Sequence, residues 1–246
     1  MEDEGTLKEV FGESSDDESK AIDNSVNGGQ IQNPRWERIK EISGLCLCRD
    51  FLSPDQQSSL LSCIQNEGWL DGGCHNQAMR FGDLPTWAIR LANSIREAVY
   101  FSDCLSQPIG GETSNEVAED CYFPAALLWR EPFFDQLILN VYQPGEGICA
   151  HVDLMRFEDG IAIVSLESSC VMHFIRVESD VDGNEQEGKK IPLHLTPGSL
   201  VLMWGEARYL WKHEINRNPG FQFWQGEEIQ QKRRTSITLR KLCNTE

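Results

Sequence analysis

Residues 136–153 read QLILNVYQPGEGICAHVD and combine a β-rich run, a Pro-Gly turn and a His-x-Asp pair. Pro-Gly is a turn signal, so residues 136–142 are predicted to form a strand that ends just before it. Further short β-rich runs follow near 161–167, 170–177, 190–195, 199–204, 208–215 and 234–242. Many short strands at this spacing predict a sandwich or a barrel.

Two helices are predicted ahead of this β-rich part. Ser53-Pro54-Asp55 is a helix-start signal, with serine as the cap, proline in the first turn and aspartate near the positive end of the helix dipole. Apolar residues at helical spacing predict a second helix over roughly 85–101. The composition of residues 70–83 and of the polar insertion 106–120 predicts loops.

The expected fold class is therefore α+β and mainly β. Its ordered domain is predicted to cover residues 33–246, with two N-terminal helices packed against a β-core of about 123–243. Residues 1–32 are poor in aromatics and rich in Glu, Asp, Ser, Gly and Asn. Such a segment cannot bury enough apolar surface to fold alone, so we predict a disordered acidic tail.

Composition narrows the class of protein further. The chain has 246 residues and a formal net charge of −17, which weighs against general coating of duplex nucleic acid. No apolar run is long enough to span a bilayer, and the acidic start does not resemble a signal peptide. The nine cysteines include no CxxC pair, so reduced thiols are expected rather than a disulfide framework or a structural zinc site. We expect a cytoplasmic or nuclear protein that does not bind membranes.

The strongest chemical signal is the pair formed by His151 and Asp153. In an extended segment these two positions face the same side, so an imidazole and a carboxylate can converge on one ion. His213, on another predicted strand, would supply a third ligand. Two histidines and one carboxylate that leave open positions are the arrangement of non-haem Fe(II) oxygenases. A His-x-Asp pair also occurs by chance, so this interpretation depends on context.

The closing strand, RTSITLR at 234–240, supplies that context. Alternation places Arg234, Ser236, Thr238 and Arg240 on one polar face, and two arginines on one face could bind a dicarboxylate. The alternative is a solvated edge strand with paired surface charges. Asn140 and Tyr142 likewise share one face of the strand before the Pro-Gly turn.

The ordered set Asn-x-Tyr, His-x-Asp, His and Arg-x5-Arg resembles the AlkB family. NVYQPGEGICAHVD and RTSITLR carry this resemblance, which extends over most of residues 45–243. PGSLVLMWGEARYLWKHEI and IVSLESSCVMHF are most similar to the branch that hydroxylates modified wobble uridines in tRNA. NQAMRFG at 76–82 resembles the nucleotide-recognition lid of that family. The sequence shows neither the RNA-recognition motif nor the methyltransferase domain that this branch often carries.

The resemblance implies a double-stranded β-helix, or jelly-roll, that uses Fe(II), 2-oxoglutarate and O2. The residues that would hold the iron are His151, Asp153 and His213. Arg234 would pair with the distal carboxylate of 2-oxoglutarate, supported by Tyr142. Asn140 and Arg240 would address its metal-proximal end. Ser236 departs from the family pattern, which has Asn at this position.

The implied function is a dioxygenase that hydroxylates or oxidatively demethylates a modified nucleobase, with tRNA or another RNA as the first candidate. Aromatic residues that could stack on an extruded base are Trp69, Phe81 and Trp87. The alternative for Trp69 and Trp87 is that they only cap helices and pack. Basic residues that could meet phosphates are Arg80, Arg208, Lys212, Lys232 and Arg233. Two alternatives stay open: an oxygenase that acts on a protein or peptide side chain, and a catalytically silent binding module.

Overall fold

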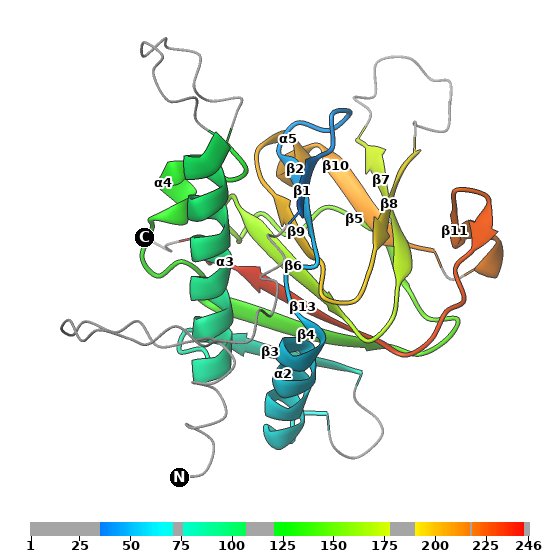
Figure 1. The fold of residues 1–246 in the computed structure, drawn as a ribbon, viewed down its shortest axis with the longest axis horizontal. Coiled ribbons are helices and arrows are strands. Elements are labelled where there is room, and N and C mark those ends of the chain that lie inside the picture. The colour runs from blue at the N-terminus through cyan, green and yellow to red at the C-terminus, as the bar shows by residue number, and fades with distance from the viewer. Residues whose placement is uncertain (1–34, 71–75, 107–120, 178–189, 217, 244–246) are drawn as a thin grey trace, which may run out of the picture.

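The structure of the protein is a computed structural model that describes residues 35–70, 76–106, 121–177, 190–216 and 218–243 (Figure 1). The predicted acidic tail, residues 1–32, lies outside the described residues. The polar insertion predicted over 106–120 does so as well, apart from its first residue.

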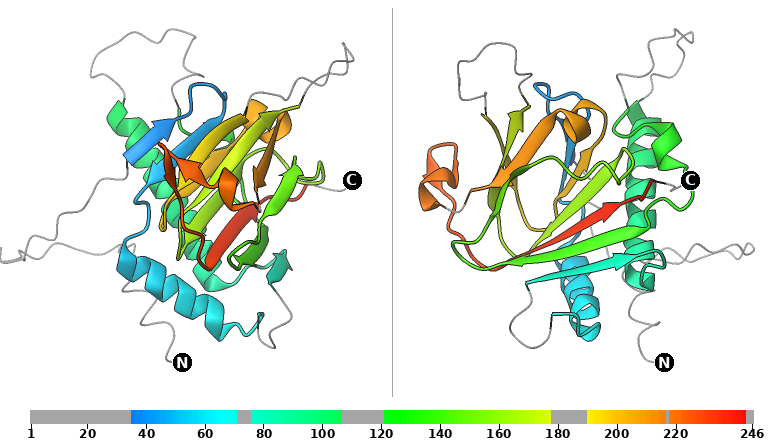
Figure 2. Two further views of the ribbon diagram at one scale, coloured as in Figure 1. Left: turned by 90° about the vertical axis from the view of Figure 1, so that its right-hand side faces the viewer. Right: turned by 180° about the vertical axis from the view of Figure 1, so that it is seen from behind.

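Two antiparallel sheets form the body of the domain (Figures 1 and 2). The major sheet contains, in spatial order, β1 (Arg35–Arg38), β2 (Leu45–Arg49), β9 (Leu200–Met203), β6 (Ile161–Leu166), β13 (Arg234–Arg240), β4 (Gln136–Tyr142) and β3 (Gln77–Phe81). The minor sheet contains β5 (Ile148–His151), β10 (Trp211–Ile215), β7 (Cys170–Arg176) and β8 (Lys190–Leu195). The arrangement confirms the predicted jelly-roll.

The predicted helices are present and pack against the major sheet (Figure 1). α2 (Pro54–Asn66) begins with a complete capping box, because Ser53 Oγ accepts from the Gln56 amide and the Gln56 side chain accepts from the Ser53 amide. α3 (Thr86–Ser106) continues further than predicted. No helix among the described residues is long and apolar enough to cross a membrane.

The remaining elements are short. α4 (Ala125–Leu128) precedes β4, and α5 (Glu206–Tyr209) joins β9 to β10. The 3-10 turn η1 (Pro219–Phe221) and the small hairpin of β11 (Phe223–Trp224) and β12 (Glu227–Glu228) follow β10. Gln222 attaches this segment to the minor sheet, since its side-chain amide exchanges two hydrogen bonds with the backbone of Val171.

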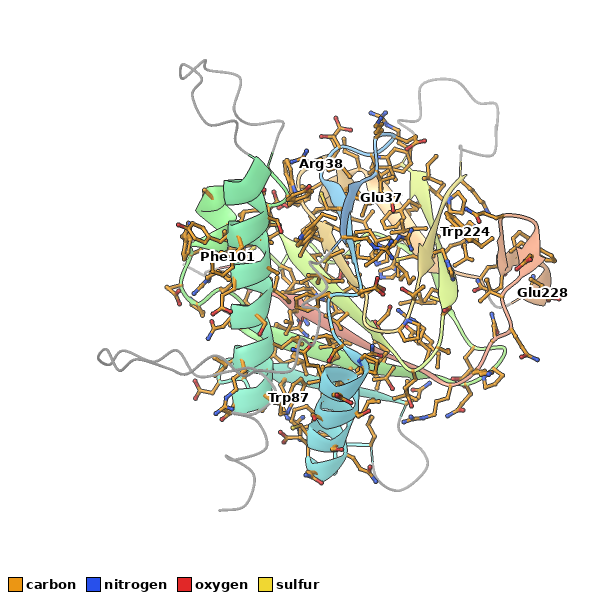
Figure 3. All side chains as sticks on the ribbon, viewed as in Figure 1. Glu37, Arg38, Trp87, Phe101, Trp224 and Glu228 are labelled. Carbon is orange, nitrogen blue, oxygen red and sulfur yellow. The ribbon has the colours of Figure 1, made fainter. Side chains whose placement is uncertain are left out.

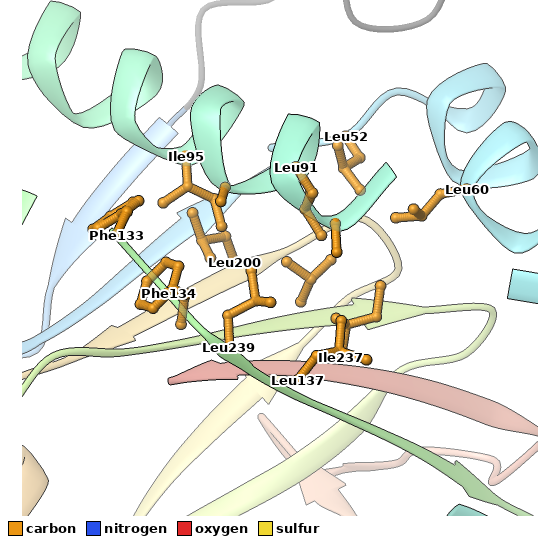
Figure 4. Close-up of a cluster of buried hydrophobic side chains, with 14 of the residues drawn as sticks. Leu52, Leu60, Leu91, Ile95, Phe133, Phe134, Leu137, Leu200, Ile237 and Leu239 are labelled. Carbon is orange, nitrogen blue, oxygen red and sulfur yellow. The ribbon is translucent and has the colours of Figure 1, made fainter. Parts of the chain in front are cut away.

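β13 has the two faces that its sequence predicts. Ile237 and Leu239 are fully buried in the core against α3, together with Leu91, Ile95 and Leu137 (Figure 4). The other face of the strand turns into the space between the sheets. A second apolar cluster occupies part of that space, with Ile163, Phe174 and Met203 among its members. The polar face of β13 is therefore enclosed rather than solvated, which excludes the edge-strand interpretation.

The loop predicted over 70–83 is partly wrong. Gln77–Phe81 is strand β3, which pairs antiparallel with β4 at the edge of the major sheet. Only Ala78 of this strand is buried, so its apolar residues give little of the alternation that marks a half-buried strand. Main-chain hydrogen bonding to β4 fixes β3 instead. β1, β2 and β3 all precede residue 123. The major sheet therefore includes residues ahead of the predicted β-core of about 123–243.

Gly44 gives a stability prediction. Its φ is +80°, and a Cβ there would lie 1.9 Å from the carbonyl oxygen of Trp204. Gly145 has a similar φ of +82° but open space around it. We expect Gly145→Ala to cost about 1 kcal/mol from backbone strain alone, and Gly44→Ala at least about 3 kcal/mol. Urea unfolding of both variants measures the difference; equal losses would contradict the steric account.

Candidate active site

His151, Asp153 and His213 converge between the two sheets. His213 on β10 lies directly opposite His151 on β5, with ring centroids 4.3 Å apart. Asp153 follows just after β5, and its Oδ2 lies 3.7 Å from His213 Nε2. One ligand atom from each of the three residues lies within 4.8 Å of the others. This spacing fits a single metal ion.

The surroundings of both imidazoles suit metal binding. The Nδ1 of His151 lies 2.9 Å from the carbonyl oxygen of Cys149. If Nδ1–H donates there, the lone pair of Nε2 faces the site. Burial lowers the pKa of His213 to about 4, although the neighbouring Asp153 carboxylate acts to raise it. His213 is therefore neutral at physiological pH, as a metal ligand must be.

Arg240 holds the third ligand. Its Nη1 donates to Asp153 Oδ1, and both side chains are buried. The contact leaves Oδ2 on the side of His213. Sequence reasoning predicts that Arg240 addresses the metal-proximal end of 2-oxoglutarate. The contact present in the structure is with the metal-ligating carboxylate, so the cosubstrate role stays a prediction.

A cavity of about 270 Å³ contains the whole predicted set. The predicted site residues that line it are His151, Asp153, His213, Asn140, Tyr142, Arg234 and Arg240. Ser236 and Thr238 of β13 also line it, with Gln77, Ile138, Leu154 and Met172 from neighbouring segments. Residues far apart in the sequence thus meet at one site.

Arg234 offers unused hydrogen-bond donors in this cavity. Its side chain is buried, and Nη2 donates to Ser165 Oγ at 2.7 Å. Nε and Nη1 have no hydrogen-bond partner among the residues that the structure describes. Nη2 keeps a second N–H besides the one that it donates to Ser165, and this N–H can act together with Nε–H or Nη1–H in a bidentate contact with a carboxylate. The residues present therefore fit the distal end of 2-oxoglutarate.

Tyr142 lies opposite Arg234 in the β4–β13 pairing. Burial raises the pKa of Tyr142, so its hydroxyl stays protonated and can donate to an anion. In the neighbouring β3–β4 pairing, Gln77 lies opposite Asn140, and its Nε2 donates to Asn140 Oδ1 at 2.6 Å. This bond orients the Asn140 amide so that its nitrogen is the group left to donate. Sequence reasoning missed Gln77, because its place beside Asn140 depends on the unrecognised strand β3.

Two of the candidate substrate contacts do not face the cavity, and for Trp87 the packing alternative is confirmed. Trp87 is buried at the start of α3 (Figure 3), and its Nε1 donates to Glu67 at 2.9 Å, so it cannot stack on a base. Arg208 is 1% exposed and donates to main-chain carbonyls, so it cannot meet phosphate. Trp69 is half-buried, with the Arg80 guanidinium 3.8 Å from the centre of its ring.

Exposed apolar side chains lie next to the cavity. Met79 and Phe81 share the face of β3 from which Gln77 enters the cavity, and both are exposed. Leu154 and Met155, directly after Asp153, are 61% and 65% exposed. We call these four residues the cavity rim. Large exposed apolar groups beside a cavity that contains a few convergent polar groups are typical of a binding surface.

A sequence profile of the 2OG-Fe(II) oxygenase superfamily matches residues 71–240. The chain belongs to this superfamily. Its relatives among the ALKBH8 proteins make it an AlkB-like oxygenase. It is thus an oxidoreductase that uses Fe(II), 2-oxoglutarate and O2, and the His151–Asp153–His213 cluster fits the iron.

Three relatives illustrate the likeness. The oxygenase is 26% identical to uncharacterized protein L905 of Acanthamoeba polyphaga mimivirus, over 85% of this chain and 89% of that one. It is 44% identical to the tRNA (carboxymethyluridine(34)-5-O)-methyltransferase ALKBH8 of Mus musculus, over 78% of this chain but 27% of the relative. The chain therefore spans only about a quarter of the length of the mouse relative. The structure of OsALKBH1 covers 84% of this chain with a TM-score of 0.56 and 15% identity, which shows the shared fold.

Proposed function

We propose that the protein hydroxylates or oxidatively demethylates a modified nucleobase in RNA, with tRNA as the first candidate. The observation that carries the proposal is the cavity rim, whose exposed apolar side chains lie on the face of β3 that bears Gln77 and directly after the candidate metal ligand Asp153. Flat bases that are taken out of a stack bind on such surfaces. The names of the ALKBH8 relatives, which refer to a tRNA uridine, support the same substrate class.

Each group in the cavity has its own task. Fe(II), with 2-oxoglutarate and O2, supplies the oxidising chemistry when bound, and 2-oxoglutarate leaves as succinate and CO2. Arg234 and Tyr142 orient the distal carboxylate of the cosubstrate. The rim holds the base so that one C–H bond faces the cavity. Hydroxylation of an N-methyl carbon would give a hemiaminal that releases formaldehyde, whereas another C–H carbon would keep its hydroxyl group.

Phe81 is the rim residue that tests the stacking role. It is 46% exposed, and the Arg156 guanidinium lies 5.4 Å from its ring centre, so a base stacked here would also meet a cation. Stacking on an aromatic side chain contributes about 1–3 kcal/mol per base. We therefore expect Phe81→Ala to raise the KM for tRNA about fivefold or more and to leave succinate formation without RNA unchanged.

The control for Phe81 is Phe223 on β11, which is 45% exposed and does not line the cavity. Phe223→Ala should leave both the KM for tRNA and succinate formation without RNA unchanged. The assay incubates wild-type and variant protein with total tRNA, and measures succinate together with the nucleosides by mass spectrometry.

The proposal predicts RNA-stimulated succinate and one nucleoside that gains oxygen or loses a methyl group. Succinate that forms equally well without RNA, with no changed nucleoside, would contradict it. That outcome would favour the peptide-modifying alternative.

A further inference from the structure

Arg208 holds the chain segment that carries Asp153. It lies in α5, and the chain runs directly from this short helix into β10, which bears His213. Its side chain reaches across to the segment between β5 and β6, which bears Asp153. We propose that Arg208 is a positioning residue of the metal centre, which sets the Asp153 backbone relative to His213.

Three hydrogen bonds carry this proposal. Arg208 Nη1 donates to the main-chain carbonyl of Asp153 at 3.0 Å. Its Nη2 donates to the carbonyls of Leu154 at 2.8 Å and Phe157 at 3.2 Å. A guanidinium is planar, so one side chain fixes the relative positions of all three carbonyls. Arg208 thus defines the start of an irregular segment whose first buried side chain is a metal ligand.

Two arginines contact different parts of Asp153. Arg208 holds the backbone of Asp153, whereas Arg240 of β13 holds its carboxylate. Fixing both the backbone and the side chain leaves the ligand oxygen little freedom. Outer contacts of this kind commonly change metal affinity by 10- to 100-fold when they are removed.

The burial of Arg208 argues against a role in packing alone. The side chain is 1% exposed, and its hydrogen bonds in the described residues are to main-chain carbonyls rather than to a carboxylate. Burying a cation costs free energy that dipoles only partly offset, so an apolar side chain would fill this space more cheaply. The guanidinium is thus explained by the carbonyls that it holds.

Arg130 provides a matched comparison on the same segment. Its Nη1 and Nη2 donate to the carbonyls of Asp159 and Gly160, at the end that leads into β6. It is therefore also a largely buried arginine that holds backbone carbonyls of this segment. It does not touch Asp153 in the described structure. The two arginines hold opposite ends of the segment, and Arg130 in addition forms an ion pair with Glu158.

The test compares Arg208→Lys with Arg130→Lys in the full chain. Both changes keep the charge and remove the planar donor group. Titration with Mn(II), followed by electron paramagnetic resonance, should show a Kd raised at least tenfold for Arg208→Lys and within twofold of wild type for Arg130→Lys. Thermal unfolding should show that both variants fold. A wild-type Kd for Arg208→Lys, or an equal rise for Arg130→Lys, would overturn the proposal.

Hydrogen exchange of the wild type decides the matter if Arg208→Lys does not fold. The amide of Phe157 donates to the carbonyl of Leu154, one of the three that Arg208 holds. A segment fixed by Arg208 should protect this amide already in metal-free protein. Protection that develops only after Mn(II) is added would show that the metal itself orders the segment, and would overturn the proposal. Neither test depends on the nucleobase substrate.

Discussion

His151→Ala is expected to reduce succinate formation more than about 100-fold, since loss of a direct ligand should exceed the effect of an outer contact. His151 supplies one of three ligands and lies opposite His213. Two remaining ligands, one of them a buried carboxylate shared with Arg240, cannot hold the ion as firmly. Mn(II) affinity and succinate formation should therefore fall together.

The control for this variant is His173→Ala. His173 is half-buried on β7, and the neighbouring Met172 rather than His173 lines the cavity. Removing it should leave metal affinity and succinate formation near wild type. Retention of full metal affinity in His151→Ala would mean that the ion binds elsewhere, and the assignment of the site would be wrong.

Arg234→Met is expected to raise the KM for 2-oxoglutarate about 100-fold, which corresponds to roughly 3 kcal/mol for a charge-assisted bidentate contact. Two of its guanidinium nitrogens have no hydrogen-bond partner in the described part of the chain and are available to a carboxylate. Methionine fills a similar space without the charge. Because removal of a buried, incompletely paired cation is seldom costly, the unfolding free energy should change little.

Arg233→Met is the matched control, because Arg233 precedes Arg234 directly but is half-exposed and pairs with Glu167. Its KM for 2-oxoglutarate should stay within about twofold of wild type, as exposed ion pairs contribute little. A KM that rises equally in both variants would point to general charge attraction instead of a specific contact. Steady-state succinate assays over a range of 2-oxoglutarate concentrations distinguish the two.

Much of the site could be predicted because its residues lie in strands with strict alternation. The period of two places Arg234 and Arg240 on one face of β13, and the structure encloses that face in the cavity. His151 and Asp153 are two residues apart in an extended segment, so their side chains face the same side. The order of these motifs along the sequence is sufficient to indicate the AlkB family without knowledge of the tertiary contacts.

The rest depended on tertiary contacts that a local pattern does not encode. β3 is a strand because β4 offers it a free edge, which its own residues do not reveal. Arg208 resembles a surface cation in sequence, yet the carbonyls that bury it come from a distant segment. Trp87 is likewise a possible stacking residue in sequence, whereas the structure shows it bonded to Glu67 and packed in the core. The roles of aromatic and basic residues therefore depend on their burial and tertiary contacts, which the sequence pattern does not give.

The most direct test of the central claim is the release of succinate from 2-oxoglutarate by the purified chain with Fe(II) in air. The account predicts that succinate forms, that a chelator abolishes it, and that it is lost in His151→Ala. Total tRNA should increase its rate. A folded wild-type protein that binds iron but forms no succinate, with or without tRNA, would contradict the account and favour a silent binding module.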